Sequence, residues 1–94
     1  MITEENESII SVCIHTTSFA EDLVFVLLES IFETSPSVWA DTNTDKSKVA
    51  VYLEREAITD IEQELIRQGI NAISESGCDV GKGELKISPV KRED

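Results

Sequence analysis

The spacing of apolar residues switches four times between strand-like and helix-like along the chain, and this restricts the fold more than any other feature. Strand-like alternation covers residues 8–15, 37–42, 48–54 and 83–90, and helical spacing covers 16–33 and 58–77. The turn formers Asn43, Asp45 and Ser47 predict a hairpin between the second and third strands. The segments therefore follow the order strand, helix, strand, strand, helix, strand.

This order is typical of one fold class. Two helices on one face of a four-stranded antiparallel sheet, in the order β-α-β-β-α-β, form the ferredoxin-like split β-α-β fold. We predict this α+β fold for residues 8–90 as a single domain, because a chain of 94 residues supports one hydrophobic core. Residues 1–7 are polar and acidic, and we predict that they form a disordered lead-in.

Both predicted helices begin with the spacing of a capping box, Ser18 with Glu21 and Thr59 with Glu62. Gly77 fits a left-handed residue that ends the second helix. The second helix is predicted to bury a stripe made of Ile58, Ile61, Leu65, Ile66, Ile70 and Ile73. Each helix should thus pack one apolar side on the sheet.

The alternation within the strands divides the predicted sheet into two faces. The helices are expected to cover the face that carries Val12, Ile14, Val49, Val51, Leu85 and Ile87. The opposite face then carries Cys13, His15, Trp39, Ala50, Tyr52, Lys86 and Ser88, and an antiparallel sheet can leave such a face wet. Because Trp and Tyr are enriched at interface hot spots, we predict a protein-docking face at His15, Trp39, Tyr52 and Lys86. The alternative is that the terminal segments or a second copy of the chain half-bury these aromatic side chains.

The charge of the chain restricts its partners. Nineteen acidic and eight basic residues give a net charge of −11. Such a surface repels nucleic-acid phosphates and anionic lipids and attracts a basic protein, so no direct nucleic-acid or membrane partner is predicted. The alternative is that the acidity serves only solubility. The start MITEENESII lacks the features of a signal peptide and the run LVFVLL is too short to span a membrane, which predicts a cytoplasmic location.

Residues with chemical reactivity are few. His15 is the only histidine, and although Cys13 lies two positions away, a Cys–His pair would also need an orienting partner. One histidine and two distant cysteines make no metal-ligand set. The stretch GCDVGKGE lacks the spacing of a phosphate-binding loop and precedes a strand rather than a helix. No catalytic, cofactor-binding or metal-binding residue is therefore predicted in this chain.

Three stretches carry a resemblance to a known family: FAEDLVFVLLESIFE after the first strand, the hairpin SPSVWADTNTDKSKVAVYLE, and the exit ISPVKRED. With them, the run from Ile10 to Asp94 resembles the N-terminal domain of the PrmA-type methyltransferases, which modify a ribosomal large-subunit protein (L-eleven). In that family this domain recognises and positions the ribosomal protein. The methyl donor, S-adenosylmethionine, binds a separate Rossmann-like domain with a glycine-rich loop. The resemblance implies a non-catalytic recognition domain, a basic ribosomal protein as partner, and residues 91–94 as the start of a linker.

A second interpretation remains open. The chain could be a free-standing ferredoxin-like domain that binds a small ligand or regulates by dimerising, with a homodimer formed through the sheet. Such domains usually carry a glycine between the first strand and the first helix, whereas HTTSF has none. An acylphosphatase-like enzyme would need an arginine in that loop, and the first arginine of the chain is Arg55, which excludes it.

Overall fold

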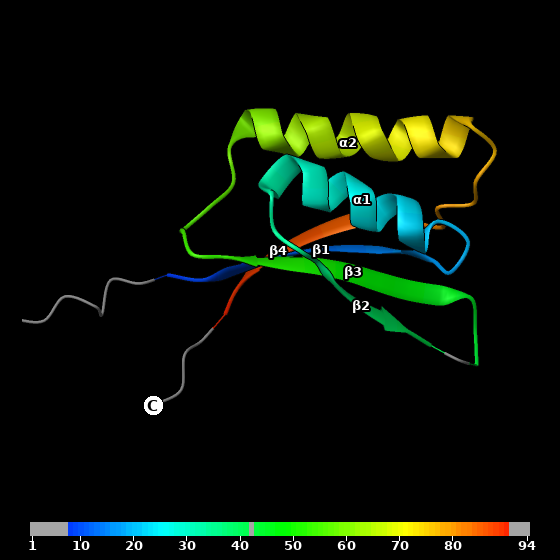
Figure 1. The fold of residues 1–94 in the computed structure, drawn as a ribbon, viewed down its shortest axis with the longest axis horizontal. Coiled ribbons are helices and arrows are strands. Elements are labelled where there is room, and N and C mark those ends of the chain that lie inside the picture. Colours follow the sequence, from blue (N-terminus) through cyan, green and yellow to red (C-terminus); the bar gives the residue numbers. More distant parts are fainter. Residues whose placement is uncertain (1–7, 42, 91–94) are drawn as a thin grey trace, which may run out of the picture.

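The computed structural model describes residues 8–41 and 43–90, and the predictions for residues 1–7 and 91–94 lie outside this part of the chain. Its elements are β1 (Ile10–Thr17), α1 (Glu21–Phe32), β2 (Ser37–Ala40), β3 (Lys46–Leu53), α2 (Asp60–Glu75) and β4 (Glu84–Pro89). Both helices lie on the same side of the sheet (Figure 1). The predicted order of the elements is confirmed.

The four strands form one antiparallel sheet in the order β2-β3-β1-β4. The long strands β1 and β3 pair at the centre, where Ile14 lies opposite Val49. The shorter strands β2 and β4 form the two edges. This arrangement confirms the predicted α+β fold of the ferredoxin-like type.

The start of the first strand, β1, and the end of the last strand, β4, are neighbours in the sheet. Ile10, which begins β1, lies opposite Pro89, which ends β4. The amide of Val90 donates a hydrogen bond of 2.8 Å to the carbonyl of Ile9. The start of β1 and the end of β4 accordingly lie side by side in Figure 1.

The core lies between the sheet and the helices. On the sheet side, Val12, Ile14, Val49 and Val51 are at most 1% exposed, which confirms the covered face at these positions. The helices contribute Val24, Leu28, Ile66 and Ile70 to the same cluster. Each aliphatic side chain buried this completely contributes about 1.5–3 kcal/mol to folding. The centre of the sheet thus supplies much of the stability of the domain.

The predicted buried stripe of α2 is wrong at two positions. Ile61 is 73% exposed and Leu65 is 45% exposed. The helix instead buries Ile66 and Ile70, and its Gly69 lies against the side chain of Leu27 in α1. A two-layer fold covers only one side of each helix, and the predicted stripe is wider than that side. Of the described segments, none forms a helix with the length and apolar character of a membrane span.

The two helices begin differently. At α2 the predicted capping box is confirmed: Thr59 Oγ1 accepts from the Glu62 amide at 3.0 Å, and Glu62 Oε1 accepts from the Thr59 amide at 2.9 Å. At α1 the prediction is wrong, because the residue before the helix is Ala20 and no side chain caps it. Glu21 instead accepts a hydrogen bond from Ser47 of β3 at 2.8 Å. The Glu21 carboxylate is therefore bonded to the sheet and not to the backbone at the start of α1.

Two threonines at the end of β1 hold the loop between α2 and β4. Thr16 Oγ1 donates to the Val80 carbonyl at 2.9 Å, and Thr17 Oγ1 donates to the Asp79 carbonyl. The loop begins at Gly77, whose φ of 101° confirms the predicted left-handed residue after α2. These contacts set the point where β4 enters the sheet.

Candidate interaction surface on the open face of the sheet

The open face of the sheet is the side opposite the helices, and the strand register fixes which side chains are neighbours on it. Trp39 of β2 lies opposite Lys48 of β3. His15 of β1 lies opposite Lys48 on one side and Glu84 of β4 on the other. Antiparallel partners point to the same face, so these four residues form one row across the sheet.

A second row lies beside the first. Cys13 of β1 lies opposite Ala50 of β3 and Lys86 of β4, and both small residues are buried. Tyr52 lies one further row along, opposite Ser11. The predicted docking residues therefore share this face, with one from each strand: His15 from β1, Trp39 from β2, Tyr52 from β3 and Lys86 from β4. Their role in docking stays a prediction.

The two aromatic side chains of this face are large and half-exposed. Trp39 is 45% exposed and Tyr52 is 47% exposed. The ammonium group of Lys48 lies 5.1 Å from the centre of the Trp39 ring, which is within the range of a cation–π contact. This contact holds one charge and one aromatic ring together at the β2 edge.

A shallow hollow of about 300 Å³ lies on the same face. Its lining residues are His15, Trp39, Ala40, Asp41, Lys46, Ser47 and Lys48. The Asp41 carboxylate at its rim accepts a hydrogen bond from the Asn43 amide at 2.9 Å, so it stabilises the hairpin turn. The hollow thus combines an exposed aromatic ring with two lysines and a histidine.

The sequence reasoning missed the lysines at positions 46 and 48. The sequence did contain the information, because alternate residues of a strand point to the same face. Lys46, Lys48, Ala50 and Tyr52 are alternate residues of β3. Together with Lys86 they place three of the chain's eight basic residues on one face. A chain with a net charge of −11 therefore has a sheet face with a locally positive character.

The geometry gives this face little capacity for covalent chemistry. Burial raises the pKa of the Cys13 thiol, and the positive charges of Lys48 and Lys86 act in the opposite direction. A thiol with a raised pKa carries little thiolate at neutral pH, so it is a poor nucleophile. Within residues 8–41 and 43–90, no group of three or more His, Cys, Asp or Glu side chains is placed to hold a metal ion.

The described residues also lack the kind of S-adenosylmethionine site that the catalytic domain of the PrmA-type family carries. Such a domain binds the methyl donor with a glycine-rich loop after its first strand. Here β1 is followed by Ser18, Phe19 and Ala20 before α1 begins. This loop contains no glycine, so the methyl donor has no site of that kind here.

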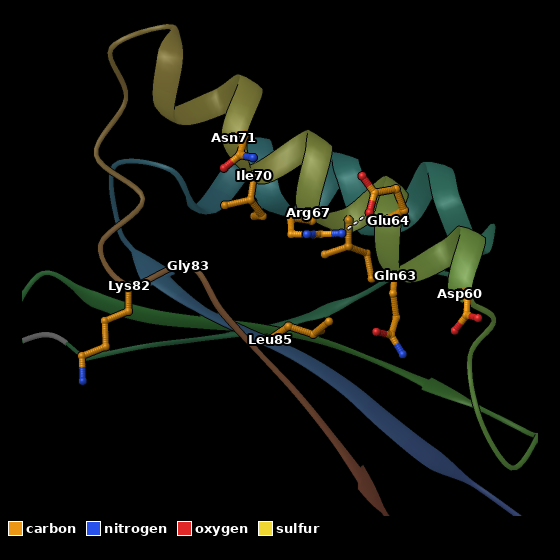
Figure 2. Close-up of a pocket in the computed structure, with 10 residues that line it drawn as sticks. Asp60, Gln63, Glu64, Arg67, Ile70, Asn71, Lys82, Gly83 and Leu85 are labelled. Carbon is orange, nitrogen blue, oxygen red and sulfur yellow. Dashed lines mark hydrogen bonds and ion pairs between the residues drawn. The ribbon is translucent and has the colours of Figure 1, made fainter.

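A second hollow, of about 580 Å³, lies on the other side of the sheet between α2 and β4 (Figure 2). Ile66, Ile70 and Leu85 give it an apolar lining, while the Arg67–Glu64 ion pair lies along the helix. The side chain of Lys82 extends away from α2 (Figure 2). On this side of the sheet Ile87 of the edge strand β4 is 38% exposed, because neither helix packs closely on that strand, and this corrects its predicted burial.

Comparisons of the chain with models of protein families, with curated proteins and with solved structures find no match. The open face offers exposed aromatic rings, lysines and a shallow hollow, and these features are suited to binding a partner.

Proposed function

We propose that this chain is a non-catalytic recognition domain that binds a protein partner through the open face of its sheet. The observation that carries the proposal is the exposure of Trp39 and Tyr52 on the sheet face that no described element covers. Aromatic side chains on such a face contribute large apolar areas and few rotatable bonds, which favours tight contact with a partner.

The proposed partner is a basic ribosomal protein of the large subunit, in keeping with the resemblance to the PrmA-type methyltransferases. The net charge of −11 supports this partner, because opposite charges speed the encounter of two proteins. On this proposal the domain positions the substrate, and S-adenosylmethionine with the methyl-transfer chemistry belongs to a separate domain.

Calorimetric titration of this chain with the purified ribosomal protein, at a low and a high salt concentration, tests the proposal. We expect a dissociation constant in the micromolar range or tighter that rises with salt. Trp39→Ala and Tyr52→Ala should each weaken binding by about tenfold. Ile61→Ala is the control, because Ile61 is an exposed apolar residue of α2 on the other side of the sheet. Absence of binding at low salt would overturn the proposal, and an equal loss in Ile61→Ala would move the interface to the helices.

A second candidate function is that of a free-standing domain that binds a small ligand. The hollow between α2 and β4 favours it, since its volume of about 580 Å³ falls within the range of ligand pockets. A rise in melting temperature with free amino acids, abolished by Leu85→Trp, would support this candidate. Regulatory dimerisation through the open face has less support, because two-fold pairing would bring the lysines of both copies together.

A further inference from the structure

The charge of the open face is opposite to that of the whole chain. Lys46, Lys48 and Lys86 point to this face by their register positions. Among the described residues, Glu84 is the acidic residue at a register position on it, and Asp41 lies at the rim of the hollow. Nineteen acidic residues outnumber eight basic ones in the chain, so the excess of positive charge here is local.

The lysines surround the apolar part of the face rather than standing apart from it. Lys46 and Lys48 line the hollow next to Trp39. Lys86 lies opposite Cys13 on the other side of β1. The floor between them consists of the buried small residues Cys13 and Ala50. A segment that lies on this floor can therefore place apolar groups on the aromatic rings and anionic groups at the lysines.

We propose that the open face binds an acidic segment of its protein partner, in which Asp or Glu side chains alternate with apolar ones. The carboxylates meet Lys46, Lys48 and Lys86, and the apolar side chains cover Trp39 and Tyr52. This inference rests on the proposed function and specifies which part of the partner is recognised. The acidic remainder of the chain attracts a basic protein from a distance, and the open face then takes an acidic segment of that protein.

An acidic protein segment fits the charges better than a nucleic acid does. A nucleic acid carries a phosphate at every nucleotide and requires many Lys or Arg residues along its path. The face offers three lysines, and the chain as a whole has a net charge of −11, which repels a continuous polyanion. A short acidic segment places its few carboxylates over the lysines, and the rest of the partner is free to be basic.

The chain contains a single tryptophan, Trp39, so its fluorescence reports directly on this face. We would titrate the chain with a short peptide of alternating glutamate and leucine, with its glutamine counterpart, and with single-stranded polyuridylate. We expect the glutamate peptide to change the Trp39 emission in a saturable, salt-sensitive way. The glutamine peptide should bind at least about tenfold more weakly, and polyuridylate should not compete.

A pair of double variants locates the charges. Lys46→Gln with Lys86→Gln leaves the Lys48–Trp39 contact in place and should weaken binding of the glutamate peptide by at least about fivefold. Arg67→Gln with Lys82→Gln makes the same change in net charge at the α2–β4 hollow, outside the open face. This control should change the affinity by less than about twofold.

Several results would overturn the inference. These are equal binding of the two peptides, equal losses in the two double variants, or polyuridylate that binds more tightly than the glutamate peptide. If the ribosomal protein binds to the chain but the Lys46→Gln, Lys86→Gln variant binds it equally well, the acidic-segment inference fails while the proposed recognition function stands. If neither the ribosomal protein nor the glutamate peptide binds, both fail.

Discussion

The two faces of the sheet are made by the same strands, offset by a single residue, yet they differ in almost every physical respect. In β1, Ile14 is fully buried under the helices, whereas its neighbour His15 lies on the open face beside a hollow. The covered face carries branched aliphatic residues, and the open face carries small, aromatic and lysine residues. The strand alternation thus assigns stability to one set of side chains and leaves the other set free for the proposed recognition role.

The largest expected effect is at the centre of the covered face. Ile14→Ala should lower the free energy of unfolding by about 2–5 kcal/mol, because it removes buried methyl groups and leaves a cavity. His15→Ala, one residue along the same strand, should change the free energy of unfolding by less than about 1 kcal/mol. Urea denaturation of both variants measures the contrast, and similar losses would show that the two faces do not divide their roles in this way.

The second prediction concerns the end of β1, where the contrast should disappear. Thr16 on the covered face and Thr17 on the open face both donate to carbonyls of the loop before β4. Thr16→Val and Thr17→Val should each cost about 1–3 kcal/mol, because each leaves a loop carbonyl without its donor. Thr16→Ser and Thr17→Ser keep the hydroxyl and serve as controls in the same denaturation experiment. A loss in Thr16→Val alone would restrict the structural role to the covered face.

Residue periodicity predicted the fold and the two faces well, because the helices and strands switch period at clear boundaries and the core side chains follow them. It failed where tertiary contacts decide. Ile61 and Leu65 fit a helical stripe, but α1 and the sheet do not extend over them. Glu21 fits a capping box, but Ser47 of another strand takes its carboxylate.

The candidate surface was predicted only in part. The alternation of residues along the strands predicted that one face carries His15, Trp39, Tyr52 and Lys86. The strand register confirms that they share a face. The positive character of that face was missed because net charge averages over the whole surface. The hollow beside Trp39 depends on which residues of β2 and β3 pair, and a sequence without the register does not reveal it.

The third prediction concerns pH on the helical side of the sheet. The hydrogen bond from Arg55, at 2.8 Å, holds the pKa of the Glu62 carboxyl below its ordinary value. A carboxyl whose pKa is lower in the folded state stabilises the protein above its unfolded pKa, and this stabilisation is lost as the pH falls through the folded pKa. Removing the pair by Arg55→Gln should therefore make the unfolding free energy fall less on acidification.

The size of this effect should be below about 1 kcal/mol, as is usual for partly exposed ion pairs. Urea denaturation at neutral pH and at successively lower pH values measures it. Lys82→Gln removes the same charge elsewhere and should keep the acid dependence of the parent chain. An unchanged acid dependence in Arg55→Gln would show that the ion pair does not contribute to it.

The smallest expected effect tests the electrostatics of the open face itself. Burial raises the pKa of the Cys13 thiol, while Lys48 and Lys86 oppose that rise. In a Cys78→Ser background, the rate of Cys13 alkylation should therefore rise with pH only above the pH range in which a free cysteine thiol ionises. Lys86→Gln should shift this rate profile to still higher pH, and Lys82→Gln should not. A profile like that of a free cysteine would contradict the burial of Cys13 on this face.

The hydrogen bond between Val90 and Ile9 has a consequence for how this domain can be combined with others. A domain whose entry and exit lie side by side can be inserted into a surface loop of a host protein without stretching that loop. It can also be circularly permuted, with new ends opened in the hairpin between β2 and β3. The same geometry keeps both attachment points at the end of the sheet where β1 begins and β4 ends (Figure 1).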